Sequence, residues 1–104
     1  MTDLEISKAL ALAIGYAPEE THKGNSGDCY VIMWNAVRTF MYYRKFDYRD
    51  WNVIGPIAEK FDCFPCKVDH GKQWEAYSPE LGHMNGYADT PQKAIALAVI
   101  GANK

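Results

Sequence analysis

The clearest hydrophobic pattern lies at the start of the chain. Apolar residues there recur every three or four positions, the spacing of one helix face; they are Ile6, Ala9, Leu10, Ala13 and Ile14. Thr2-Asp3-Leu4-Glu5 has the pattern of a capping box, Met1 and Ile6 are placed to form a hydrophobic staple, and Gly15 is a natural terminator. The pattern predicts a helix that begins at once and ends near Gly15.

A second helix is predicted at the end of the chain. Thr90 is a good N-cap, and Pro91 then occupies the first helical position, where a missing N–H does no harm. The stretch from Ala94 to Ile100 contains no polar residue, so this helix has apolar surface on nearly every side. We expect a sheet to cover it, with another helix alongside.

The middle of the chain combines strand-like and helical patterns. Cys29–Trp34 and Val37–Tyr43 are rich in β-branched and aromatic residues and predict strands, although residues 34–40 would also suit a helix. A further helix is predicted from about Asp50, its N-cap, to Phe61. We favour this start over an earlier one because it places Pro56 close to the first turn, where proline is tolerated.

A β-hairpin is predicted next. Cys63–Val68 is a short apolar segment whose Pro65 favours an edge strand, and Gly71-Lys72 would form the turn to Trp74–Tyr77. Turn-forming residues predict loops in two stretches, Pro18–Asp28 and Ser78–Gly86. We therefore expect a single domain over residues 1–104, of the α/β (α+β) class. A mainly antiparallel sheet would be packed by helices, in the order α-β-β-α-β-β-α.

Composition narrows the functional classes. The chain of 104 residues is 48% hydrophobic and 23% charged, which suits one compact domain. Its formal net charge of −2 gives no long-range attraction to nucleic acid or to anionic membranes. No apolar stretch is long enough to cross a bilayer, and the first residues lack the basic start of a secretory signal. Three cysteines, an odd number, do not make a disulfide framework, so we expect a cytoplasmic protein without membrane contact.

Three segments of the chain resemble small bacteriophage proteins of the NinX-like group. They are the opening Leu4–Gly15, the central Asp50–Ile57, and the closing Trp74-Glu75-Ala76 together with Thr90–Ile95. The same segments are similar to the phage ABA sandwich domain, in which helices enclose a sheet on both faces. The resemblance implies an accessory protein of a phage or prophage, working in the host bacterial cell, with no established enzymatic activity and no catalytic residues to transfer.

Cys63 and Cys66 have the spacing of a thiolate pair that can coordinate one zinc ion. Cys29 and His70 would complete four ligands, provided that the fold brings Cys29 to the hairpin. The alternative is that the cysteines are reduced and act as small buried hydrophobes. A redox role would need Cys63 at the start of a helix, whereas a helix is predicted to end before it. We therefore expect reduced cysteines and no cofactor, and zinc binding is the alternative.

The second candidate site is the segment from Arg38 to Arg49, where four cations are interleaved with five aromatic rings. Bases can stack on aromatic rings while cations track phosphates, so this composition is typical of a single-strand-binding surface. The candidate contacts are Arg38, Tyr42, Tyr43, Arg44, Lys45 and Arg49. Aromatic residues at strand spacing also pack in cores and across strands. Exposed aromatic side chains from Tyr42 to Trp51 would serve equally as a patch for homodimer formation.

Hydrolytic chemistry lacks a complete set of residues. Asp69, His70 and His83 could supply a base, but no nucleophile motif, carboxylate pair or phosphate-binding glycine loop accompanies them. Together with the phage resemblance, this lack of a site leads us to expect a non-enzymatic phage accessory protein that binds a host or phage macromolecule. The alternatives are a nucleic-acid-binding module that uses residues 38–49 and a small zinc-binding domain.

Overall fold

The computed structural model describes residues 2–24, 27–68, 73–78 and 82–102, without the side chains of 77, 78 and 82–87. Its first element is helix α1 (Asp3–Ala13). The predicted capping box is present, because the N–H groups of Glu5 and Thr2 donate to Thr2 Oγ1 and Glu5 Oε1, both at 3.1 Å. Gly15 follows with a φ of +116°, which favours glycine. The predicted helix is confirmed. Met1, one of the two residues of the predicted hydrophobic staple, lies outside the described residues.

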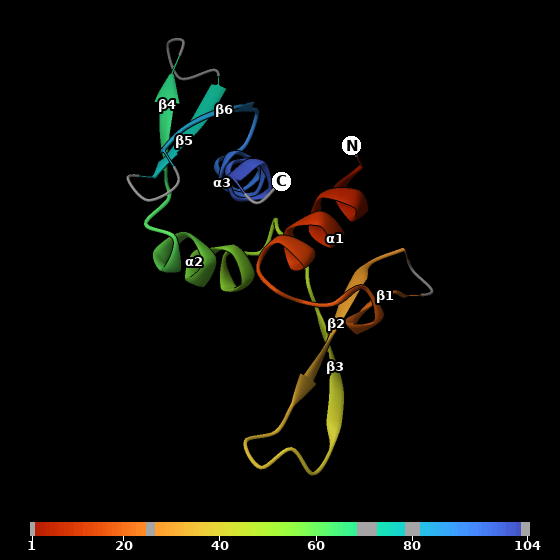
Figure 1. Cartoon of the computed structure of the whole chain (residues 1–104). Coiled ribbons are helices and arrows are strands. Elements are labelled where there is room, and N and C mark those ends of the chain that lie inside the picture. Colours follow the sequence, from red (N-terminus) through yellow and green to blue (C-terminus); the bar gives the residue numbers. More distant parts are fainter. Residues whose placement is uncertain (1, 25–26, 69–72, 79–81, 103–104) are drawn as a thin grey trace.

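In the described part of the chain, six strands form two antiparallel sheets of three strands each (Figure 1). Sheet A consists of β1 (Thr21–Lys23), β2 (Cys29–Trp34) and β3 (Met41–Lys45), in that order. Sheet B consists of β4 (Phe64–Val68), β5 (Gln73–Ser78) and β6 (Gly82–Ala88). The fold is α+β with antiparallel sheets packed by helices, which confirms the predicted class. The edge position of β4 also agrees with the prediction from its proline.

Two strands stand where the sequence predicts loops. β1, preceded by a 3₁₀ turn at Pro18–Glu20, lies in the Pro18–Asp28 connection, and β6 occupies most of the Ser78–Gly86 loop. Neither strand has a strong pattern of its own; both form because β2 and β5 offer backbone partners. In sheet A, the strand predicted from Val37 begins only at Met41, and the helical alternative for residues 34–40 is wrong because residues 35–40 form a turn.

Helix α2 (Trp51–Lys60) starts where the sequence predicts. Its N-cap is Asp50, whose Oδ1 accepts from the Asn52 N–H at 2.9 Å. Pro56 lies inside the helix, further from the start than we expected. Its missing N–H leaves the Asn52 carbonyl without a helical donor, and Asn52 is exposed, so water can donate to that carbonyl instead.

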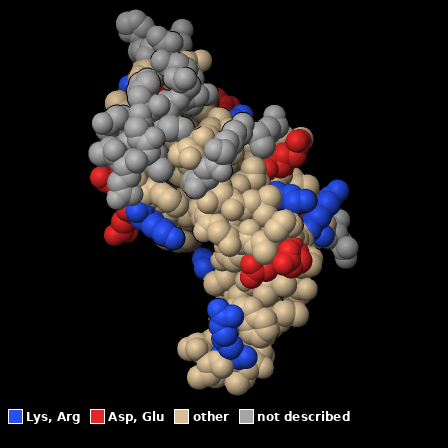
Figure 2. All heavy atoms as spheres, in the orientation of Figure 1, with Lys and Arg blue, Asp and Glu red and all other residues tan. Residues whose placement is uncertain are grey.

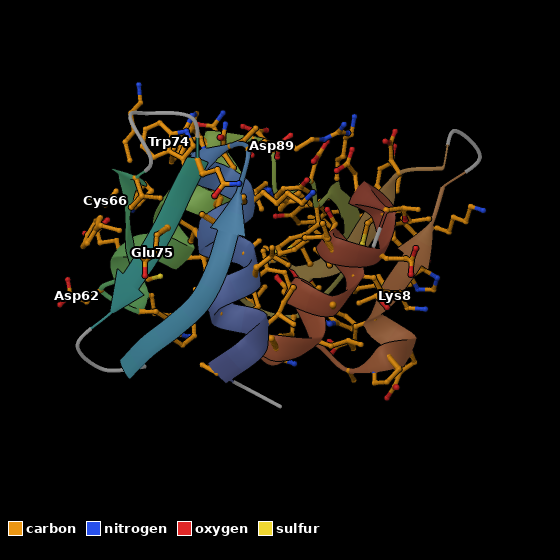
Figure 3. The ribbon with its side chains drawn as sticks, turned by 90° about the horizontal axis from the view of Figure 1, so that it is seen from above. Lys8, Asp62, Cys66, Trp74, Glu75 and Asp89 are labelled. Atoms are coloured by element: carbon orange, nitrogen blue, oxygen red, sulfur yellow. The ribbon has the colours of Figure 1, made fainter. Side chains whose placement is uncertain are left out.

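Helix α3 (Pro91–Ala102) lies at the centre of the molecule. Thr90 caps it as predicted, because its Oγ1 accepts from the Lys93 N–H at 3.2 Å. Its buried side chains are Ala94, Ile95, Ala96, Ala98, Val99 and Ile100, and they pack against all three strands of sheet B and against α1 and α2. Seen from above, sheet B, α3, α1 and sheet A follow one another (Figure 3). Helices therefore cover one face of each sheet, which differs from the single enclosed sheet that the phage resemblance implies.

A polar cluster joins sheet A to the start of α1. The Arg49 guanidinium donates to both carboxylate oxygens of Asp47, at 2.9 and 2.8 Å, and to Asp3 Oδ2 at 3.1 Å. The Tyr48 hydroxyl donates to Asp3 Oδ1 at 2.5 Å, and its N–H donates to Ser7 Oγ at 3.1 Å. The hydrogen bonds from Arg49 hold the pKa of Asp47 below its usual value. Burial, together with Asp3, raises the pKa of Tyr48.

Asp47→Asn is expected to lower the free energy of unfolding by about 1 kcal/mol at pH 7, because it weakens a partly exposed charge-assisted pair. The lowered pKa means that this stabilisation is present above the unfolded pKa of about 3.9 and is lost as the pH falls through the folded pKa. Urea unfolding from neutral to strongly acidic pH measures it. The free energies of unfolding of the wild type and of Asp47→Asn should converge at acidic pH. A difference between them that does not depend on pH would contradict the role of Asp47. The exposed Glu19→Gln is the control.

Candidate macromolecule-binding face

β2 and β3 form a hairpin, residues 29–45, that projects from the rest of the molecule and that we call the arm (Figure 1). Cys29 and Val31 are buried at its base, whereas every side chain of β3 is exposed. At the tip, Val37 and Phe40 expose 73% and 59% of their surface. Exposed apolar side chains that lie together are a candidate interaction surface.

Asn35 fixes the turn at the tip of the arm. Its Oδ1 accepts from the N–H groups of Thr39 and Phe40, at 2.8 and 3.1 Å, and its Nδ2 donates to Thr39 Oγ1 at 2.7 Å. Arg38, a predicted nucleic-acid contact, lies in this turn with a φ of +56°, which is uncommon for a residue with a side chain. The tip is therefore a defined turn that holds its apolar side chains in solvent.

The strand register divides the side chains of the arm between two faces. Trp34 lies opposite Met41, and Ile32 opposite Tyr43; directly opposed side chains share a face. One face gathers neighbouring, mostly aromatic side chains from all three strands. We call it the aromatic face, and it consists of His22, Tyr30, Ile32, Trp34, Met41 and Tyr43. Trp34, Met41 and Tyr43 are 43%, 48% and 54% exposed, so this face of sheet A is open.

An open hollow of about 350 Å³ lies on the aromatic face beside β1, lined by His22, Lys23, Gly24, Tyr30 and Tyr43. The rings of His22 and Tyr43 meet edge to face, with centroids 5.2 Å apart. Gly24 makes room for the Tyr30 ring, because a Cβ at residue 24 would lie 2.5 Å from Tyr30 Cε2. Aromatic rings with a lysine at the rim suit a flat ligand ring that carries negative charge.

Charge on the arm is positive and sparse. On the side seen in Figure 2, the outer part of the arm is mainly uncharged, and its charged side chains are basic. Arg38 and Arg44 are exposed, whereas Lys45 forms an ion pair with Asp28 at 3.5 Å. Contacts with rings and apolar groups would therefore contribute more to binding on this surface than contacts with phosphates.

The structure does not bring the six predicted nucleic-acid contacts to one surface. Tyr43 and Lys45 lie on the side of the aromatic face, whereas Tyr42 and Arg44 lie on the opposite side of the arm. Arg49 lies beyond the arm, in the ion pairs of the polar cluster. Because successive strand residues alternate between faces, residues 38–49 do not form one continuous binding surface.

Sequence reasoning missed much of the aromatic face. His22 belongs to a strand that the sequence predicts as a loop, and Tyr30, Ile32 and Trp34 lie before the segment that composition marks as a candidate surface, residues 38–49. A signal was available in β2, where Tyr30, Ile32 and Trp34 recur at every second position. Period-two alternation places them on one side of a strand.

The cysteines lie in different environments. Cys29 is buried in β2, and Cys63 is buried between α2 and β4. Burial raises the pKa of both thiols, that of Cys63 to about 11. Cys66 is exposed on β4, at the outer edge of sheet B (Figure 3). Among the described residues, no three His, Cys, Asp or Glu side chains gather as a metal-binding group, and His70 lies outside these residues. The zinc site remains a prediction.

Iodoacetamide at mildly alkaline pH is expected to label Cys66 alone in the folded protein. The thiolate is the reactive form, and burial disfavours it at Cys29 and Cys63. Mass spectrometry should show one adduct on the folded chain, three after unfolding in urea, and none on folded Cys66→Ser. A zinc site that includes Cys66 would instead protect this thiol until a chelator is added, and that result would support the zinc hypothesis.

Comparison with known proteins gives no relative: no protein-family model, curated protein or solved structure matches this chain. In the part of the chain that the structure describes, no helix is long and apolar enough to span a membrane. The fold and its open face define a small α+β protein with a projecting aromatic arm.

Proposed function

We propose that this protein is a non-enzymatic accessory protein, of the small phage type that its sequence resembles, and that it binds another macromolecule through the aromatic face. The observation that carries the proposal is that Trp34, Met41 and Tyr43 are about half exposed on one side of a projecting arm. Large exposed apolar patches on small proteins are often binding sites, and aromatic residues supply much of the energy of such contacts.

The non-enzymatic part of the proposal rests on the sequence. The phage resemblance implies no catalytic residues, and no motif for a nucleophile or a phosphate loop is present. The residues considered as bases, Asp69, His70 and the side chain of His83, lie outside the described part of the chain. Turnover of a nucleic acid or metabolite that disappears on their substitution would overturn this part.

A pull-down from infected or lysogenic cells tests the binding proposal. The tagged wild type should retain a macromolecule that Trp34→Ser loses, because this change removes an exposed ring from the aromatic face. Leu12→Ser is the matched control, since Leu12 is a comparably exposed apolar residue, at 38%, on α1. If both variants retain the macromolecule as well as the wild type does, the aromatic face is not the binding surface.

The second candidate is binding of single-stranded nucleic acid. The observation that favours it is the hollow on the aromatic face, where three rings and Lys23 surround a space suited to a flat base. The net charge of −2 gives no general attraction to phosphates, so we expect weak binding that salt reduces further. Fluorescence anisotropy with a labelled oligonucleotide measures it, and no binding at low salt would remove this candidate.

A further inference from the structure

The outer edge of β3 carries unpaired backbone groups in a regular order. The Phe46 N–H donates to the Cys29 carbonyl at 2.8 Å, and the Asn35 N–H donates to the Phe40 carbonyl at 3.3 Å. In an antiparallel pair, alternate residues exchange hydrogen bonds with the partner strand, so Tyr42 and Arg44 also bond to β2. The N–H and C=O groups of the residues between them, Met41, Tyr43 and Lys45, therefore point outward.

β3 lacks most of the features that protect an edge strand. It is the last strand of sheet A, its register with β2 is regular, and it contains no proline. No strand among the described residues pairs with its outer side. Such an edge is a template for another strand unless charges prevent pairing, and the charges here are Arg44 and Lys45. A partner strand must therefore place no cation opposite these two residues.

We propose that the occupant of this edge is β3 of a second copy, paired antiparallel about a twofold axis at Tyr43. Tyr43 then lies opposite the partner's Tyr43, Met41 opposite the partner's Lys45, and Tyr42 opposite the partner's Arg44. All five strand residues are paired and each cation meets an apolar or aromatic side chain. A shift that moves the axis to Arg44 would oppose two arginines, and a shift toward the tip would leave both cations outside the paired strands.

The pairing joins the two copies without covering the aromatic face. The three outward residues of each strand supply about six main-chain hydrogen bonds, and the two sheets become one sheet of six strands. The twofold axis makes the contact self-complementary and closed, so it stops at a dimer. The Tyr43 rings of both copies then lie side by side, and the two aromatic faces form one larger surface.

Sedimentation equilibrium over a wide concentration range tests the dimer. We expect the wild type to dimerise and Tyr43→Pro to remain monomeric, because proline removes an outward N–H that β2 does not use. Tyr43→Thr keeps the N–H and should still dimerise, and equal melting of the two variants at low concentration shows that the arm is intact. A monomeric wild type, or a Tyr43→Pro dimer of unchanged affinity, overturns the proposal.

Two further measurements test the register in the wild-type fold. Amide exchange by NMR should protect Tyr43 only at concentrations where the dimer forms, and Tyr42 at all concentrations. Met41→Glu places a carboxylate opposite the partner's Lys45 and should tighten the dimer several-fold, whereas Met41→Lys should weaken it several-fold. A dimer with an unprotected Tyr43 amide, or with equal affinity in the two Met41 variants, contradicts this pairing.

Discussion

Ile95→Ala is expected to lower the free energy of unfolding by about 2–5 kcal/mol, a large part of the stability of a small domain. Ile95 is fully buried in α3, the helix that packs against sheet B, α1 and α2. The substitution leaves a cavity at the point where these elements meet. Alanine has the higher helix propensity, so a loss of stability would come from packing and not from the helix itself.

Urea unfolding at neutral pH measures this effect against a matched control. Leu97→Ala removes the same three carbons from the same helix, at a position that is only partly buried, so it should cost clearly less. Equal losses of unfolding free energy in the two variants would mean that the side chain of Ile95 does not lie deeper in the core than that of Leu97. An Ile95→Ala protein that fails to fold would agree with the expectation, provided that Leu97→Ala folds normally.

Capping residues and apolar stripes predict the helices well, because both act within a few residues along the chain. Thr2 with Glu5, Asp50, and Thr90 with Pro91 each begin a helix as their side chains require. Pro56 is the exception: α2 continues through it, since the buried face of the helix is held by the core and the freed carbonyl belongs to the exposed residue Asn52. Tertiary packing here outweighs a local preference.

Strands that depend on a distant partner are the part that the sequence could not predict. β6 contains Gly82 and Gly86 and reads as a loop, yet it pairs with β5 and packs on α3. β1 is only three residues long and exists through its pairing with β2. Since neither strand has a pattern of its own, the division of the strands into two sheets was also beyond sequence reasoning.

The candidate site was only partly predictable for the same reason. Sequence composition identified the exposed aromatic and basic segment, but the face on which each side chain lies depends on strand register. A slip of one residue would exchange Tyr42 and Tyr43 between the two sides of the arm. The contribution of His22 to the aromatic face depends on β1, which sequence alone does not reveal.

On the second candidate function, binding of single-stranded nucleic acid, Tyr43→Ala is expected to weaken binding to a labelled oligonucleotide roughly ten- to hundredfold, while Tyr42→Ala changes it little. A ring that stacks on a base contributes about 1–3 kcal/mol, and only Tyr43 lines the hollow with His22 and Tyr30. The two tyrosines are neighbours with similar exposure, 47% for Tyr42 and 54% for Tyr43. They differ in the face that they occupy.

Anisotropy titrations at low salt measure the affinities of both variants for the oligonucleotide. Sedimentation of each variant shows whether its dimerisation has changed, so that a change in oligonucleotide binding can be told apart from it. Equal losses would indicate that the whole arm, and not one face, contacts the ligand. If Tyr43→Ala binds the oligonucleotide with wild-type affinity, the binding site lies elsewhere. Because the two substitutions remove the same side chain from adjacent positions on opposite sides of β3, a larger loss in Tyr43→Ala would support a binding site on the aromatic face.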